Sequence, residues 1–199
     1  MIAAVVFVAH AGHRSQPQGK SVKPSAVDIG FAQDMMVHHQ QAVLMAAYTR
    51  EHAGSSEIRL LAATIDAAQQ REIGQMVGWL QSWGKPTSSD RPPMSWMMTG
   101  SMHHEMRMGH GDVGAVMPGM ATQAEMDALV NLTGAELDAR FLQLMTRHHR
   151  GGLPMAKYAV NHARMRFVRD TARSMILDQQ REIDQMLTLM QARGVEPLP

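Results

Sequence analysis

The chain has 199 residues, enough for one sizeable domain or for two small halves that share a core. Its 19 basic and 18 acidic side chains leave a formal net charge of +1, so no strong overall field would attract nucleic acid or an anionic surface. Methionine is the outlier, with 20 residues beside 11 histidines and no cysteine. Thioethers without thiols suit an oxidising or copper-exposed compartment, where a thiolate would be oxidised.

The first residues read MIAAVVFVAHA, an apolar run whose A-x-A-like ending is typical of an export signal. The run lacks the basic residues that begin such a signal, and it is shorter than the roughly 20 residues that span a bilayer. We interpret residues 1–24 as the remnant of an export signal or membrane anchor followed by a flexible N-terminus. A plain apolar N-terminus is the alternative, and no other stretch is expected to cross a membrane.

Two copies of one pattern, 110 residues apart, organise the rest of the chain. FAQDMMVHHQQAVLMAAY begins at Phe31, and FLQLMTRHHRGGLPMAKY begins at Phe141. The same offset relates Asp28 to Asp138 and the QQREI of residues 69–73 to that of residues 179–183. Because the offset never slips, both copies should have elements of equal length, which indicates an internal duplication.

Each copy predicts two amphipathic helices. Apolar residues recur at intervals of three and four, and β-branched residues are few, which favours helices over strands. Capping boxes predict where helices begin: Ser25 with Asp28, Thr133 with Glu136 and, for a short helix, Thr122 with Glu125.

The predicted fold is all-α. None of the four long helices could bury its apolar stripe alone, so we expect residues 25–199 to form a single four-helix-bundle domain made of two duplicated hairpins. The first hairpin should span about 25–84, the Met/His-rich connecting linker about 85–132, and the second hairpin about 133–194.

The stripe expected to line the bundle carries imidazoles and thioethers in both copies. Residues spaced by seven share one helix face, and Met35 and Met145 complete that seam. The seam residues are Phe31, His38, Met45 and His52, repeated as Phe141, His148, Met155 and His162, with His39 and His149 beside them. A buried imidazole is costly unless its nitrogens are satisfied, so a fold that repeats the arrangement is expected to use it to bind metal.

Other residues on these stripes leave alternatives open. A methionine stripe is usually core filler, and we assign Met76 and Met186 to the core. Glu72 and Glu182 could orient metal-bound imidazoles, or they could pair with an arginine.

The linker is dense in soft donors without a steady period. Thioether and imidazole ligands together select copper, and Cu(I) in particular, over metals that prefer oxygen. The alternatives are a solvated loop and a Met-rich surface that binds other proteins. The candidate ligands are Met94, Met97, Met98, Met102, His103, His104, Met106, Met108, His110, Met117 and Met120.

The doubled core M-x-x-HH-x(5)-MA, with MPGMA before its second copy, resembles the domain-of-unknown-function 305 family. The resemblance covers most of residues 28–194 and implies a ferritin-like helical bundle, an envelope location and copper binding linked to copper tolerance. The motif positions are Met35, His38, His39 and Met45, with Met145, His148, His149 and Met155. Gly151-Gly152 and Pro154 depart from the first copy and are expected to distort the second site.

We therefore predict an exported copper-binding protein, periplasmic or anchored at the cell envelope. It would buffer or carry Cu(I), and Cu(II) as well, without turnover. Metal ions are the expected partners; a copper-transport or copper-oxidising protein and a homodimer are further candidates, and nucleic acid is not expected. The alternatives are a copper- or di-metal-dependent oxidoreductase and a Met-rich interaction module. A di-iron centre would require Glu-x-x-His, which neither His-bearing helix contains.

Overall fold

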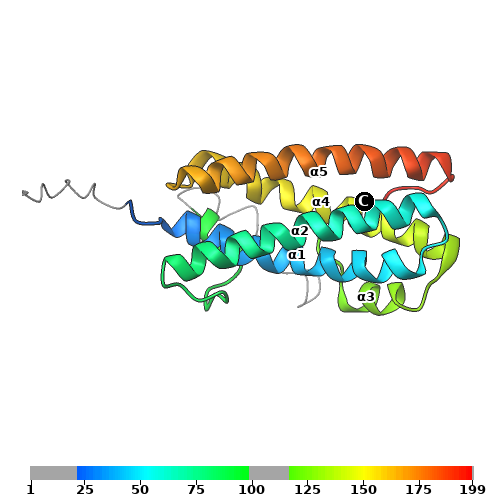
Figure 1. Cartoon of the computed structure of the whole chain (residues 1–199), viewed down its shortest axis with the longest axis horizontal. Coiled ribbons are helices and arrows are strands. Elements are labelled where there is room, and N and C mark those ends of the chain that lie inside the picture. The colour runs from blue at the N-terminus through cyan, green and yellow to red at the C-terminus, as the bar shows by residue number, and fades with distance from the viewer. Residues whose placement is uncertain (1–21, 99–116, 199) are drawn as a thin grey trace, which may run out of the picture.

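The computed structural model describes residues 22–98 and 117–198, and this part of the chain is helical. Four long helices form a bundle: α1 (Ala26–His52), α2 (Ser56–Ser82), α4 (Gly134–His162) and α5 (Arg166–Ala192) (Figure 1). The single turn η1 (Ser95–Met97) and the short α3 (Gln123–Leu129) belong to the linker. The predicted all-α bundle of two hairpins is confirmed.

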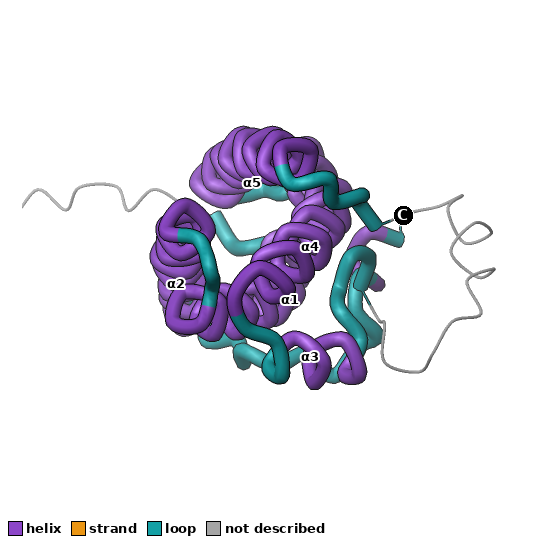
Figure 2. The backbone as a smooth tube through the Cα atoms, turned by 90° about the vertical axis from the view of Figure 1, so that its right-hand side faces the viewer, coloured by secondary structure: helices purple, strands orange, loops and turns teal. Residues whose placement is uncertain are grey.

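The two histidine-bearing helices are the central pair. α1 packs against both α2 and α4, and α4 packs against α5 (Figure 2). Within the described residues, no strand forms beyond an isolated bridge between Ala53 and Gly134. No helix of this described part combines the length and apolarity that a bilayer-crossing helix needs.

Side-chain caps begin two of the predicted helices as expected. Ser25 with Asp28 starts α1, and Thr122 with Glu125 starts α3, each as a complete capping box. The capping box predicted at Thr133 is wrong, because its side chain accepts no hydrogen bond at the start of α4. Gly134 follows with φ 61, a left-handed backbone that turns the chain into the helix without the threonine oxygen.

The two copies are tied together reciprocally. The Asp138 carboxylate accepts hydrogen bonds from the backbone N–H groups of Gly54 (2.9 Å) and Ser55 (3.0 Å), where α2 begins. The Asp28 carboxylate does the same at the start of α5, accepting from Arg164 (3.1 Å) and Met165 (2.9 Å). Free N–H groups at a helix start carry partial positive charge, so each carboxylate stabilises the turn of the other copy. The copies are thus antiparallel and related by an approximate two-fold axis.

Two buried apolar clusters fill the bundle on either side of the histidines. One holds Phe31, Met35 and Met155, and the other holds Phe141, Met45 and Met145, as the approximate two-fold requires. Met76 and Met186 are fully buried in these clusters, which confirms their assignment to the core.

Candidate metal-binding site

Two imidazoles meet at the contact between α1 and α4. The ring centroids of His38 and His148 lie 3.8 Å apart at 36°, and both side chains are buried. Nε2–H of His148 donates to the carbonyl oxygen of His38 (3.0 Å), and Nε2–H of His38 donates to that of Pro118 (3.3 Å). A carbonyl oxygen only accepts, so both protons are on Nε2 and each Nδ1 presents a lone pair.

A second imidazole from each copy is held by a carboxylate. Nε2 of His39 donates to Glu72 (2.6 Å), and Nε2 of His149 donates to Glu182 (2.7 Å). Both glutamates therefore contact imidazoles and not arginines, and Arg181 pairs with Asp178; that they orient metal-bound imidazoles stays a prediction. These two bonds link α1 to α2 and α4 to α5 at matched positions.

The four histidines share one hydrogen-bonding pattern. In each ring an oxygen atom fixes Nε2, while Nδ1 is buried and has no hydrogen-bond partner among the described residues. Histidines that ligate metals are held in this way, with one nitrogen donating to an oxygen and the other left to the metal. A buried polar atom without a partner costs about 1–3 kcal/mol. Each Nδ1 is therefore a candidate donor to a transition-metal ion of the kind that imidazole binds.

Burial keeps the central pair neutral. Desolvation, with electrostatic repulsion from His39 as the next largest cause, lowers the pKa of His38 to about 3. Desolvation, followed by repulsion from His38, holds the pKa of His148 well below its usual range. The Nδ1 lone pairs of both rings are therefore available throughout the physiological pH range.

Thioethers of the seam flank these imidazoles. Met35, Met45, Met145 and Met155 are all fully buried. Each copy contributes one methionine to either side of the histidine pair, because Met35 shares a cluster with Met155, and Met45 with Met145. The amide oxygens of Gln69 and Gln179, which lie on α2 and α5, are also buried without a hydrogen-bond partner in the described structure.

The described residues contain no group of three or more His, Cys, Asp or Glu side chains that could hold a metal ion. A metal bound between α1 and α4 would consequently need ligands from outside that set of residue types. Methionine sulfur is the donor that the buried seam supplies.

His52 and His162 do not lie in the buried seam, so the prediction that they line it is wrong, and their role as metal ligands stays a prediction. Both are exposed at the last residue of their helices; the His52 ring stacks on Tyr48 (centroids 4.1 Å apart), and the His162 ring lies tilted against Tyr158 (4.2 Å). An α-helix drifts by about 20° per heptad from a strict seven-residue repeat. Three heptads after Phe31 the drift has carried His52 out of the interface.

Both ends of the linker pack on the bundle and do not form a solvated loop. Met94, Met97 and Met117 are buried in the cluster of Met35 and Met155, whereas Met98 is 39% exposed and Met120 is half-buried. Asp34 fixes the first of these two ends, because its carboxylate accepts from the backbone N–H of Met94 (2.6 Å) and from the Trp96 indole (2.7 Å). Six further predicted ligands lie outside the described residues: Met102, His103, His104, Met106, Met108 and His110.

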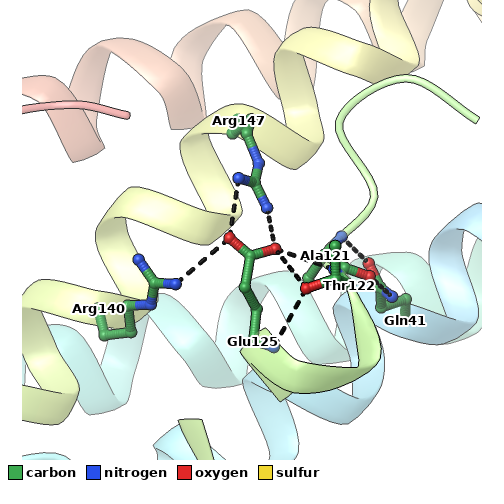
Figure 3. Close-up of polar contacts among 6 residues, drawn as sticks. All are labelled: Gln41, Ala121, Thr122, Glu125, Arg140 and Arg147. Atoms are coloured by element: carbon green, nitrogen blue, oxygen red, sulfur yellow. Dashed lines mark hydrogen bonds and ion pairs between the residues drawn. The ribbon is translucent and has the colours of Figure 1, made fainter. Parts of the chain in front are cut away.

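Residues 117–121 cover the histidine pair and explain why the second copy departs from the first. Gln41 exchanges two hydrogen bonds with the backbone of Ala121, at 2.6 and 2.9 Å (Figure 3). At the matching position of α4, a Cβ on Gly151 would lie 2.0 Å from the Pro118 carbonyl oxygen. The glycine is therefore required for the close approach of Pro118, whose carbonyl orients His38.

The same segment is fixed at its other end by an ion pair. Arg147 of α4 hydrogen-bonds Glu125 (2.9 Å), and Arg140 lies 3.3 Å from it (Figure 3). The hydrogen bonds from Arg147 lower the pKa of Glu125 to about 2. α4 runs unbroken through Gly151, Gly152 and Pro154, and the expected distortion of a second site stays a prediction.

Sequence reasoning missed the Pro118 carbonyl as the partner of His38. The signal was present in MPGMA and in the glycine at residue 151, but their meeting depends on how the linker folds back.

Comparisons with solved structures place this fold among related proteins. A DUF305 protein from Streptomyces coelicolor, described as secreted, is 42% identical, with a TM-score of 0.75 over 87% of this chain and 97% of its own. A DUF305 fragment from Deinococcus radiodurans is 28% identical, with a TM-score of 0.69 over 86% of this chain and 99% of its own. CopM in its Cu(I)-bound form is 25% identical, with a TM-score of 0.61 over 83% of this chain and 96% of its own.

No curated protein matches the chain. The model of the family described as Domain of unknown function (DUF305) matches residues 28–190, which include both hairpins and the four buried histidines. The chain belongs to the DUF305 family.

Proposed function

We propose that this protein is an exported copper-binding protein that buffers or carries Cu(I), and also Cu(II), through imidazole and thioether ligands without turnover. One observation carries the proposal: four buried imidazoles have Nε2 anchored to oxygen and Nδ1 without a partner in the described structure, with fully buried methionines on either side. The similarity to CopM, solved in Cu(I)- and Cu(II)-bound forms, supports copper as the cargo.

The donor chemistry favours copper over zinc. Zinc prefers thiolate to thioether, and the chain has no cysteine. Thioethers bind Cu(I) without losing a proton, and His38 stays neutral at mildly acid pH. The site should therefore keep its affinity under conditions in which an exposed imidazole would protonate. Export is supported by the likeness to the Streptomyces coelicolor protein, which is described as secreted, and by the lack of cysteine in the chain.

The test is a titration of the purified full chain with Cu(I) against a competing chelator. We expect tight, stoichiometric uptake by the native protein. The variant His38→Gln/His148→Gln should bind less copper at saturation and keep its far-UV helicity. The matched control is His52→Gln/His162→Gln, which removes two exposed histidines at equivalent positions of the two copies and should bind the full amount.

Other results would select the alternatives. If the central variant keeps every equivalent of metal, the buried pair is not a site. Micromolar or weaker uptake by the native protein would favour the Met-rich interaction module. Sustained oxygen consumption by the copper-loaded protein in the presence of a reductant would show turnover, and would identify a copper oxidoreductase instead of a carrier.

A further inference from the structure

Three aromatic side chains lie together at one end of the bundle. Trp79 and Trp83, near the end of α2, contact Phe167 at the start of α5, with ring centroids 5.3 and 6.1 Å away. Phe167 is 40% exposed, and both tryptophans are half-buried. We refer to these three residues as the aromatic patch. Large aromatic surface of this kind is uncommon on a soluble domain unless it contacts something.

The aromatic patch borders a hollow where the described chain begins. This hollow has a volume of about 540 Å³; Val22, Pro24 and Trp83 supply apolar walls, and Lys23 and Lys85 are among its lining residues. Val22 is itself 62% exposed. Figure 1 shows the start of α1, the end of α2 and the start of α5 at the same end of the bundle. The apolar run of residues 2–9 precedes this point in the sequence.

The same end of the molecule is basic, although the net charge of the chain is only +1. Residues 22–24, 82–91 and 163–173 contain seven basic side chains and two acidic ones. The basic residues are Lys23, Lys85, Arg91, Arg164, Arg166, Arg169 and Arg173, and the acidic ones are Asp90 and Asp170. Asp28, at the start of α1, also lies at this end, but its carboxylate is buried and accepts hydrogen bonds from backbone N–H groups. The near-neutral total therefore conceals a segregation of charge that only the fold reveals.

We propose that this end of the bundle docks on a phospholipid surface with anionic head groups. Tryptophan and phenylalanine favour the boundary between head groups and acyl chains, and lysine and arginine next to them bind anionic lipid. A second copy of the chain fits this end less well, because two basic surfaces would repel each other. The proposal is independent of copper, since the aromatic patch lies outside the histidine seam.

The experiment uses the full chain, without metal and again loaded with copper. Sedimentation with vesicles of phosphatidylcholine plus phosphatidylglycerol should remove the protein from solution, and vesicles of phosphatidylcholine alone should remove much less. Lipids brominated on the acyl chain should quench tryptophan fluorescence. Trp96 is an internal control, because it is buried and bonded to Asp34. The variant Trp79→Phe/Trp83→Phe retains Trp96 alone and should show little quenching.

Two sets of variants test the contact itself. Each cation removed near an anionic surface should lower the partition coefficient about fivefold, so Lys23→Gln/Lys85→Gln should lower it about 25-fold. Its control is Arg50→Gln/Arg193→Gln, because Arg50 lies in the last turn of α1 and Arg193 directly follows α5, at the opposite end of the bundle. The variant Trp83→Ser/Phe167→Ser should also release the protein from vesicles, whereas Leu60→Ser, at an exposed position on α2, should not.

The proposal is overturned if the native chain ignores anionic vesicles, or if the aromatic and lysine variants bind them as well as the native chain does. In the latter case the membrane contact lies elsewhere, for example in residues 2–9. It is also overturned if the aromatic substitutions abolish self-association or capture of a protein and leave vesicle binding unchanged. Copper uptake is measured separately on the same samples, so failure here does not affect the proposed function.

Discussion

Acid should destabilise the metal-free protein through the two histidines at the helix contact. His38 and His148 are neutral in the folded state, and burial lowers the pKa of His38 from 6.5 to about 3. The unfolded chain gains a proton on each ring as the pH falls below 6.5, whereas the folded chain does not. The unfolded state then binds more protons, so the free energy of unfolding decreases as the pH falls and is level above the unfolded pKa.

The size of the effect follows from the unfolded pKa. Between about pH 7.5 and about pH 5.5, one such histidine lowers the free energy of unfolding by about 1.4 kcal/mol, and the pair lowers it by about 3 kcal/mol. Urea unfolding at constant ionic strength, followed by far-UV circular dichroism at both pH values, measures this difference. The variant His38→Gln/His148→Gln should lose most of the pH dependence, and His38→Gln alone should lose about half.

This comparison does not depend on how stable each variant is in absolute terms, because the measured quantity is the change between two pH values. The control His52→Gln/His162→Gln removes exposed rings and should keep the full change. If the central double variant retains the pH dependence of the native protein, the two rings are not the buried neutral pair described above.

Two further substitutions test the packing. Gly151→Ala places a methyl group against the Pro118 carbonyl and should lower the free energy of unfolding, measured by heat or urea, by about 1–3 kcal/mol. The control Gly74→Ala meets no atom within 4 Å and should raise it by about 0.5–1 kcal/mol. Equal effects of the two substitutions would refute the close approach of Pro118 to Gly151. Asp138→Asn weakens the cap of α2 and should lower the free energy of unfolding by about 1–3 kcal/mol. Asp28→Asn should lower it further, because that carboxylate caps α1 as well as the start of α5. Calorimetry that ranks the two variants in the opposite order would contradict this.

Much of the fold was predictable because the duplication constrains it. Equal spacing in both copies predicted four helices of matched length, and the boxes at Ser25 and Thr122 marked real helix starts. Thr133 also precedes a real helix start, but its side chain makes no cap, because a sequence pattern does not reveal the left-handed backbone at Gly134. The sequence pattern of a capping box therefore predicted a side-chain cap correctly at the two helices whose first residue has no positive φ.

The site was predictable in its centre and not at its edges. His38 and His148 meet because a seven-residue seam keeps its direction over one heptad from Phe31 and Phe141. His52 lies too far along the helix for that to hold. The position of the linker on the bundle could not be predicted, because a segment without hydrophobic periodicity does not indicate which of its side chains face the core. Burial of Met94 depends on Asp34, which lies 60 residues earlier in the sequence.

The most direct test of copper binding by imidazole and thioether is copper K-edge X-ray absorption of the full chain loaded with Cu(I). The account predicts both sulfur and imidazole nitrogen among the atoms bonded to copper, with a reduced imidazole contribution in His38→Gln/His148→Gln and an unchanged one in His52→Gln/His162→Gln. A spectrum with nitrogen and oxygen alone, or one that the central substitutions leave unaltered, would contradict it.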